Sequence, residues 1–443
     1  MGSGDERTGS ALHFAVFLLL LLAAHGASAA GPGFTPQKRI GHTTGDQWEP
    51  TLAADGHGHV YVLYPQYGTV RNCPGCAVPT ITLLVSSDNG LTWQSPKSLM
   101  PSSTGQFDPQ IVVDPADRQT LYASWLQNNR RDVMVARSAD FGRTWFLAVA
   151  DRGQEDADKP VLAVRGLDVY VGFNHERKFL VAASHDAGDT FTSVKVNANA
   201  EPGWSLAGGG TVDSTGNVYF SWTAYARLDM AKRPMNVYIS RSQDGGHAWT
   251  TTLLDVSAAP PDCAEQVCGT GYLSAQAALA SDSTGTIYAL WNAGSTNGGP
   301  ERIYFSSSTT AGASWSAKTD VSTADRGVES GFPAITAGAA GDVRVAWMDA
   351  RTGDARGQPL WNTFYRSSTN GGATWSAESQ LSGPLRGYDY IVPGGFRFPF
   401  GDYFGIAIDS EGATQAVWGE AGITNRPARS GTLTADSGST FLF

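Results

Sequence analysis

Acidic and basic residues that could carry out chemistry recur directly before short apolar segments of the chain. The set contains carboxylates, an amine and a phenol, which together can exchange protons or hold Ca²⁺. It comprises Glu49, Asp108, Asp158, Lys159, Gln276, Asp402 and Tyr403. We predict Asp158 and Asp402, together with Asp349 on a loop, as catalytic acids or bases. A water-filled channel lined by solvated polar groups would account for the same residues and stays open as the alternative.

Arginines on the loops could clamp a negatively charged ligand, because a guanidinium group can bind a carboxylate through two parallel hydrogen bonds. We predict Arg177 and Arg351 as such clamps, with ordinary surface ion pairs as the alternative. The other predicted ligand contacts are polar or aromatic, and the tryptophans could either stack on sugar rings or cap the core. These contacts are Glu49, Asp108, His175, Trp48, Trp204, Trp361, Tyr388 and Tyr390. No metal-ligand spacing appears in the sequence, and we expect no required cofactor, with Ca²⁺ as an optional ion.

An eight-residue pattern, S-x-D-x-G-x-T-W, recurs along the chain. It occupies 86–93, 138–145, 184–191 and 242–249, with Phe191 closing the third copy and Ala248 replacing the threonine of the fourth. Copies at 308–315 and 368–375 have Thr310 and Asn370 in place of the aspartate, and a weaker seventh copy covers 434–441. The pattern predicts a hairpin turn, because the aspartate can accept backbone N–H groups and the glycine can take a positive φ.

Each octet follows an alternating segment that is typical of a half-buried strand and ends in an aromatic residue. Another short apolar segment precedes it, and one more strand follows the turn, so that each unit has four strands. We therefore predict an all-β fold, a seven-bladed β-propeller of four-stranded antiparallel blades over residues 30–443. The last outer strand is nearly absent, and we expect residues 36–40 to supply it and close the ring.

The loops of each predicted blade differ in length between its two ends. Short loops and octet turns lie at one end, and long polar loops lie at the other. The long loops span 65–80, 223–236, 254–274, 292–301, 348–362 and 381–401. Binding sites often lie on loops that a rigid scaffold holds in place. We therefore expect the site at this end, which we call the long-loop face, near the ring axis.

The octets resemble the Asp-box, or BNR, repeats of sialidases and related secreted propellers. For the fold, this resemblance implies a six-bladed sialidase-type propeller as the alternative to seven blades. For the site, it implies an arginine triad, an aspartate acid–base and a tyrosine nucleophile paired with a glutamate. The sequence departs from that set: Trp-Glu-Pro at 48–50 replaces Arg-Ile-Pro, Phe332 stands where the tyrosine is expected, and 219–223 lacks the second arginine.

Three functions remain open on this basis. The first is a secreted propeller that binds or cleaves extracellular glycans, acidic polysaccharides among them. The second is a noncatalytic protein-interaction scaffold at the cell surface, and the third is an exo-α-sialidase with rearranged catalytic loops. The net charge of −10 argues against nucleic acid as a partner.

Residues 1–29 have the features of a signal peptide. Their apolar run at 14–24 is too short to span a bilayer, and small residues precede a cleavage point near Ala30. We therefore expect a secreted or periplasmic protein without membrane insertion. In an oxidising compartment, Cys73, Cys76, Cys263 and Cys268 suggest two disulfides, with the two local pairings favoured and a Cys₄ zinc site as the alternative.

Overall fold

Strands are the regular elements of the described chain. The computed structural model describes residues 1–2, 33–35, 37–42, 45–47, 49–153, 156–175, 178–197, 205–225, 234–260, 275–353, 359–383, 385–386, 403–419 and 440–442. Within these ranges no residue is helical. The predicted all-β fold is confirmed for this part of the chain. It agrees with the sequence, in which no long stretch has the 3.6-residue apolar period of an amphipathic helix.

The described strands pair into seven antiparallel sheets, which we number in chain order. Sheet 1 contains β2 (Asp46–Gln47), β3 (Thr51–Ala54), β4 (Val60–Tyr67), β5 (Thr80–Ser86) and β6 (Lys97–Ser98). Sheet 2 contains β7 (Phe107–Val113), β8 (Leu121–Gln127), β9 (Asp132–Ser138) and β10 (Phe146–Arg152). Sheet 3 contains β11 (Ala157–Arg165), β12 (Asp168–His175), β13 (Lys178–Ser184) and β14 (Thr192–Lys195). Sheet 4 contains β15 (Ser205–Val212), β16 (Val218–Tyr225), β17 (Met235–Ser242) and β18 (Thr250–Ser257).

The other three sheets follow the same order. Sheet 5 contains β19 (Ala277–Ser281), β20 (Ile287–Gly294), β21 (Glu301–Ser308) and β22 (Thr319–Asp320). Sheet 6 contains β23 (Ser330–Ala337), β24 (Val343–Gly353), β25 (Pro359–Ser368), β26 (Ser379–Gln380) and the added β27 (Leu385–Arg386). Sheet 7 contains β28 (Gly405–Ile408), β29 (Thr414–Gly419), β30 (Thr440–Leu442) and β1 (Lys38–Ile40).

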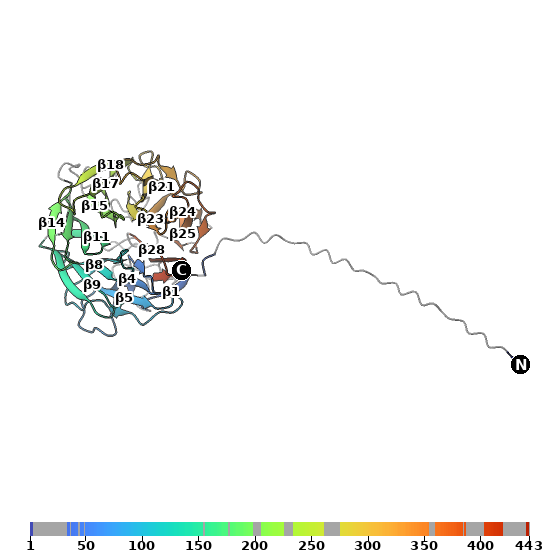
Figure 1. Ribbon diagram of the computed structural model, residues 1–443, viewed down its shortest axis with the longest axis horizontal. Helices are drawn as coiled ribbons and strands as arrows, with labels where there is room; N and C mark the ends of the chain where they lie inside the picture. The colour runs from blue at the N-terminus through green and yellow to red at the C-terminus, as the bar shows by residue number, and fades with distance from the viewer. Residues whose placement is uncertain are drawn as a thin grey trace. The chain divides into compact units, whose positions relative to one another are not determined.

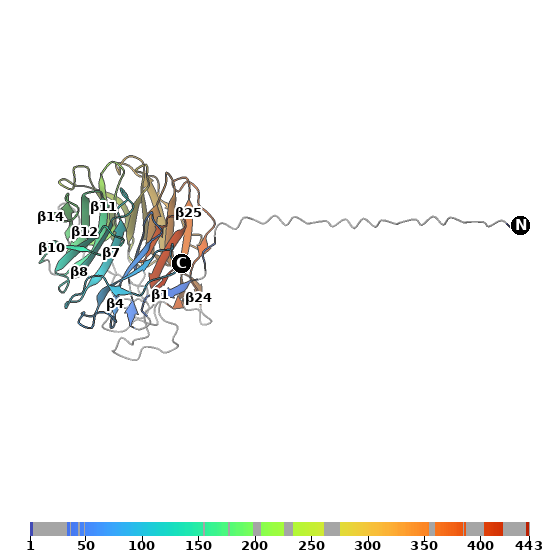
Figure 2. The ribbon, with the colours of Figure 1, turned by 60° about the horizontal axis from the view of Figure 1, so that its bottom comes forward.

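The sheets stand around a common axis, with the first long strand of each sheet innermost (Figure 1). These inner strands contact one another in the cyclic order β3, β7, β11, β15, β19, β23, β28 and back to β3. Figure 2 shows the sheets side by side and roughly upright around that axis. The predicted β-propeller of four-stranded antiparallel sheets is therefore the architecture of this chain.

The core lies between adjacent sheets rather than at the centre of the ring. Five sheets carry a fully buried tryptophan on the second strand, namely Trp125, Trp222, Trp291, Trp347 and Trp418. Trp222 of sheet 4, for example, stacks on Phe179 of sheet 3 with 5.5 Å between ring centroids. Burying one side chain of this size contributes about 1.5–3 kcal/mol. The repeated aromatic residue of each unit therefore joins its sheet to the preceding one.

The octets form the turns that their sequence predicts. In the first copy, Ser86 Oγ donates to Asp88 Oδ1 at 2.7 Å, and Asp88 Oδ1 accepts the Thr92 N–H at 2.8 Å. The Gly90 N–H donates to Ser86 Oγ at 2.9 Å, and Gly90 has a φ of 83°. The copies around Asp140, Asp186 and Asp244 repeat these bonds, and Thr310 and Asn370 accept the equivalent N–H in theirs.

The N-terminal strand completes the last sheet. β1 pairs antiparallel with β30, with Lys38 opposite Leu442 and Ile40 opposite Thr440. Figure 1 shows the two strands together beside the C-terminus. The predicted closure by residues 36–40 is confirmed for Lys38–Ile40, which give β30 a pairing partner from the other end of the chain.

One of the two predicted disulfides is present in the described chain. Cys73 and Cys76 are bonded to each other, as the local pairing requires. Cys263 and Cys268 lie outside the described residues. In the described part of the chain, no helix has the length and apolar character needed to cross a membrane.

Candidate functional site

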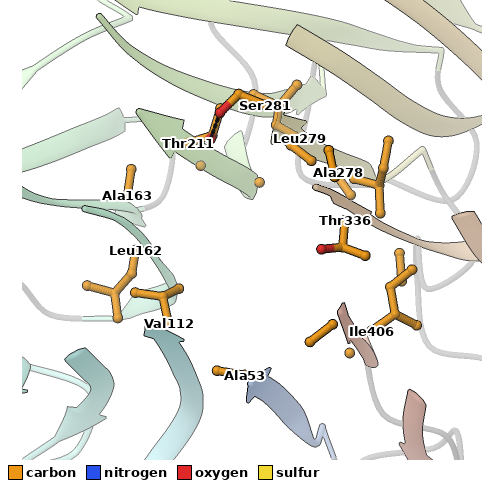
Figure 3. Close-up of a pocket in the computed structure, with 18 of the residues that line it drawn as sticks. Ala53, Val112, Leu162, Ala163, Thr211, Ala278, Leu279, Ser281, Thr336 and Ile406 are labelled. Atoms are coloured by element: carbon orange, nitrogen blue, oxygen red, sulfur yellow. Dashed lines mark hydrogen bonds between the residues drawn. The ribbon is translucent and has the colours of Figure 1, made fainter. Parts of the chain in front are cut away.

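A channel of about 890 Å³ runs along the axis of the ring. All seven inner strands line it, and its middle wall is made of small and aliphatic side chains such as Ala53, Val112, Leu162 and Ile406 (Figure 3). Thr211 and Ser281 bond to each other at 2.8 Å, so that their hydroxyls satisfy one another in the wall. Chemistry that needs charged groups must therefore take place at an end of the channel.

The two ends of the channel differ in how their polar groups are bound. At the short-turn end, charged residues join neighbouring sheets. Asp114 accepts the Gly166 N–H at 2.9 Å, and Arg344 donates to the Gly412 carbonyl at 2.8 Å. At the long-loop face the lining residues are Lys159, Thr223, Gln276 and Tyr403, and we call these four the mouth residues. Thr223 is 2% exposed, and its hydroxyl has no hydrogen-bond partner among the described residues.

Backbone strain recurs where inner strands begin at the long-loop face. Glu49, Asp108, Lys159 and Phe332 each precede a proline at the start of an inner strand, and each has a left-handed φ of 47° to 56°. Three of these strands show a register shift at this point. Such a conformation costs about 1–3 kcal/mol for a non-glycine residue and is found mainly at functional sites. The X-Pro pair that recurs at the start of these four inner strands is the sequence signal for this feature.

The inner strand of sheet 4 has a register shift at the same point, with glycines there and no left-handed residue. A Cβ on Gly208 would lie 2.0 Å from the Ala277 carbonyl oxygen of sheet 5, so no other residue fits there. Sheets 4 and 5 therefore approach more closely at the axis than a side chain would allow.

Two contacts connect the strained strand entries across the long-loop face. The Lys159 N–H donates to Asp108 Oδ2 at 3.4 Å, which joins sheets 2 and 3. Tyr403, which directly precedes the inner strand of sheet 7, donates from its hydroxyl to the Pro109 carbonyl of sheet 2 at 3.1 Å. The structure thus brings together Asp108, Lys159 and Tyr403 from the predicted polar set. Gln276 lines the same mouth from sheet 5.

Asp349 and Arg351 are paired with each other. Asp349 is fully buried, and it accepts hydrogen bonds from Arg351 Nε at 2.8 Å and from Trp347 Nε1 at 3.0 Å. Arg351 also bonds to Glu378 and lies 3.6 Å from the ring centroid of Phe364. Burial opposes the charge of Arg351, but the hydrogen bonds that it donates to Asp349 and Glu378, together with the charges of these carboxylates, prevail and raise the pKa of the guanidinium. Arg351 is therefore part of an ion pair, although the expected alternative to a clamp was a surface pair and Asp349 is fully buried.

The remaining predicted residues occupy different surroundings. Glu49 is buried, whereas Asp158 is half-buried on β11 and lies opposite Asn174 in the sheet. His175 ends β12, and its Nδ1 is buried without a hydrogen-bond partner among the described residues. Trp361 is 1% exposed and contacts Phe332, which fits the expected capping of the core rather than sugar stacking. Six predicted residues lie outside the described residues, namely Trp48, Arg177, Trp204, Tyr388, Tyr390 and Asp402.

A second recurring motif lies at the short-turn end and was missed in the sequence. Tyr61, Tyr219 and Tyr288 donate at 2.8 Å to an aspartate six residues earlier, which are Asp55, Asp213 and Asp282. In sheet 7, Gln415 takes the place of the tyrosine and donates to Asp409. The pattern D-x-x-G-x-x-Y, present in the sequence, could have predicted these bonds.

Metal binding has no support from the described side chains. Among the residues that the structure describes, no group of three or more histidine, cysteine or acidic residues is placed to hold a metal ion. The expectation of an optional Ca²⁺ at the carboxylates of the strand entries stays a prediction.

Comparison with known proteins gives a family match and several fold matches. A family model described as a BNR repeat-like domain matches residues 35–267, more than half of the 443 residues. No curated protein matches the chain. An ulvan lyase from a new polysaccharide lyase family is 14% identical with a TM-score of 0.49, over 86% of this chain and 93% of the lyase. A Hadza microbial sialidase is 14% identical with a TM-score of 0.44, and the match covers 89% of this chain and 65% of the sialidase. The intramolecular trans-sialidase from Ruminococcus gnavus is 12% identical with a TM-score of 0.40, and the match covers 86% of this chain and 92% of the trans-sialidase. Likenesses at this level concern the fold alone.

Proposed function

The chain belongs to the family of BNR repeat-like domains, and from this premise we propose that it is a secreted, sialidase-like Asp-box propeller that binds or cleaves extracellular glycans at the mouth residues. We count each sheet as one blade and so propose seven blades, where the sialidase-type alternative has six. Residues 1–29 would direct its export.

The observation that carries this proposal is the strained ring of strand entries around one end of the channel. Four non-glycine residues in left-handed conformation recur there, in four different sheets, and one of them, Lys159, lines the channel. A fold retains strain of this kind when the resulting side-chain positions are useful. The opposite end of the channel carries hydrogen bonds that join the sheets. Its left-handed non-glycine residues lie in loops instead of strand entries: Arg118 beside the channel, and Asn89, Phe141, Ala187 and Ala311 in the octet turns.

The mouth residues fit a ligand that is rich in hydroxyl groups and carries some negative charge. Thr223 and Gln276 offer neutral polar atoms, and Tyr403 a phenol, while Lys159 supplies a positive charge at the same end. An acidic glycan has both the hydroxyl groups and the negative charge. Lys159 would then bind the negative charge, the role expected from the sequence for Arg177 and Arg351.

Binding tests this proposal directly. We expect the secreted chain to bind members of a glycan array that contains sialylated, uronate-containing, sulfated and neutral glycans. Lys159→Gln should weaken binding of acidic glycans at least tenfold, whereas the matched variant Arg118→Gln, at the other end of the channel, should leave it unchanged.

A separate variant tests whether the protein cleaves the glycan that it binds. If the protein is an enzyme, Asp158→Asn should abolish cleavage of the bound glycan while binding persists. Binding without cleavage would make the protein a lectin-like propeller. An equal effect of Lys159→Gln and Arg118→Gln would contradict the proposed site. Capture of a partner protein without any glycan binding would favour the interaction scaffold.

A further inference from the structure

Two glutamates meet in the buried seam between sheets 5 and 6. Glu301 begins β21 and is fully buried, and Glu329 directly precedes β23, the inner strand of the next sheet. The Glu301 N–H donates to Glu329 Oε2 at 3.1 Å. The other oxygen of that carboxyl, Oε1, is buried and has no hydrogen-bond partner among the described residues.

The groups around the two carboxyls are neutral. Asn292 of β20 donates its amide to Glu301 Oε2, and Ser257 of β18 donates its hydroxyl to Glu301 Oε1 at 3.3 Å. Ser330, beside Glu329, contributes only another uncharged hydroxyl. Neither glutamate forms an ion pair within the part of the chain that the structure describes.

The charged residues on the same elements are bound elsewhere. Arg302 on β21 pairs with Asp320 and donates to the carbonyls of Ala324 and Asp325. On β18, Asp255 pairs with Lys318. On β24, Asp349 pairs with Arg351. Among the residues that the structure describes, the charge that acts on Glu301 is that of Glu329, which has the same sign.

Two adjacent buried carboxylates without a cation cannot both be ionised at moderate cost. We propose that one carboxyl of the Glu301–Glu329 pair stays protonated at neutral pH, and that this proton keeps the seam between sheets 5 and 6 closed at the long-loop face. The pair then acts as a switch that weakens the seam when the proton is lost at alkaline pH. This inference does not depend on the identity of the ligand.

Hydrogen bonds connect the pair to the channel mouth. Asn292, whose amide group donates to Glu301, also accepts the backbone N–H of Gln276 at 2.8 Å through its Oδ1. Gln276 is one of the mouth residues. A second carboxylate charge in the seam would displace Asn292 and with it the strand entry that carries Gln276.

The direction of the pH dependence follows from burial. Burial is the largest cause that raises the pKa of both glutamates, to about 8 for Glu329, and the charge of Glu329 adds to the rise for Glu301. An acid whose pKa is higher in the folded protein than in the unfolded chain binds more protons when folded. Stability therefore falls as the pH rises from about 4.5, the usual value for glutamate, towards 8.

Thermal and chemical unfolding from pH 5 to pH 9 tests the inference in the full chain. Glu329→Gln keeps the shape of the side chain and removes the ionisable group. We expect equal stability of this variant and the parent protein at pH 5, and a growing advantage of the variant at higher pH. The unfolding constant of the parent should rise relative to the variant by up to about tenfold per pH unit.

Two further variants keep the experiment decisive. Glu301→Gln should give the same pH dependence and carries the test if Glu329→Gln does not fold. Glu411→Gln, at an exposed glutamate, is the matched control and should follow the parent curve. Parallel curves for the parent and both seam variants between pH 5 and pH 9 would overturn the proposal.

Discussion

In the octets that contain the aspartate, this one residue holds the turn together through hydrogen bonds to residues two to four positions away. Asp88 and Asp140 accept hydrogen bonds from the hydroxyl and backbone N–H of the threonine four residues later. These bonds, together with one from the preceding serine, lower the pKa of each carboxyl to about 2. The turn is therefore most stable when the carboxylate is ionised.

Acid should weaken these turns. Because the folded pKa lies below that of the unfolded chain, the contribution of Asp140 is complete above about pH 4 and is lost as the pH falls towards 2. We expect Asp140→Asn to leave stability at pH 7 nearly unchanged, since Asn370 forms the same frame in sheet 6. The variant should lose less stability than the parent between pH 4 and pH 2 in urea titrations.

The reciprocal exchange is the control for this prediction. Asn370→Asp should make the loss of stability in acid steeper. If both variants unfold in parallel with the parent at every pH, the octet aspartates do not contribute through their charge.

At the scale of the element, an aspartate–tyrosine bond joins the first two strands of several sheets. Tyr288 is fully buried and donates to Asp282, which is itself 4% exposed. Sheet 3 lacks the aspartate, because Arg165 and Gly166 occupy the turn. There the hydroxyl of Tyr170 is buried without a hydrogen-bond partner among the described residues.

This contrast gives a matched pair of substitutions. Tyr288→Phe should lower the free energy of unfolding by about 1–3 kcal/mol, because it leaves a buried carboxylate without one of its donors. Tyr170→Phe removes a hydroxyl that bonds to nothing in the described chain and should change stability little. Equal losses for the two variants in chemical denaturation would show that ring packing, and not the hydrogen bond, dominates at this position.

At the scale of the whole molecule, the ring depends on a strand from the opposite end of the chain. β1 lies at the edge of sheet 7 and pairs with β30 over three residues. Just before it, the side chain of Gln37 accepts the Gly383 N–H at 3.0 Å. The N-terminal segment thus contacts both the last sheet and the segment that follows β26 of sheet 6.

Removal of this segment should open the ring. We expect deletion of residues 30–42 to lower the melting temperature by several degrees or more and to promote association, because the edge of β30 loses its partner. Deletion of residues 30–35 alone keeps both Gln37 and β1 and is the matched control. Identical melting curves for the two deletions would show that the closure contributes no stability.

The sequence by itself determined the repeated turns, the strands and the closure of the ring. The octet bonds connect residues two to four positions apart, so that residue types and spacing are enough to predict them. The alternation of apolar and polar residues within each segment likewise predicts the strand that the segment forms. The aliphatic channel and its polar long-loop mouth then follow from the repetition of one unit around an axis.

Tertiary structure alone decided which polar side chains remain available to a ligand. Asp349 and Arg351 have the residue types of an acid and a clamp, but they form an ion pair with each other. Phe364 on the neighbouring strand and Glu378 just before β26 complete the surroundings of Arg351. Glu301 and Glu329 look ordinary in the sequence and become a buried pair only because sheets 5 and 6 bring them together. Burial and neighbouring charge set the role of a carboxyl group, and both arise from residues far apart in the chain.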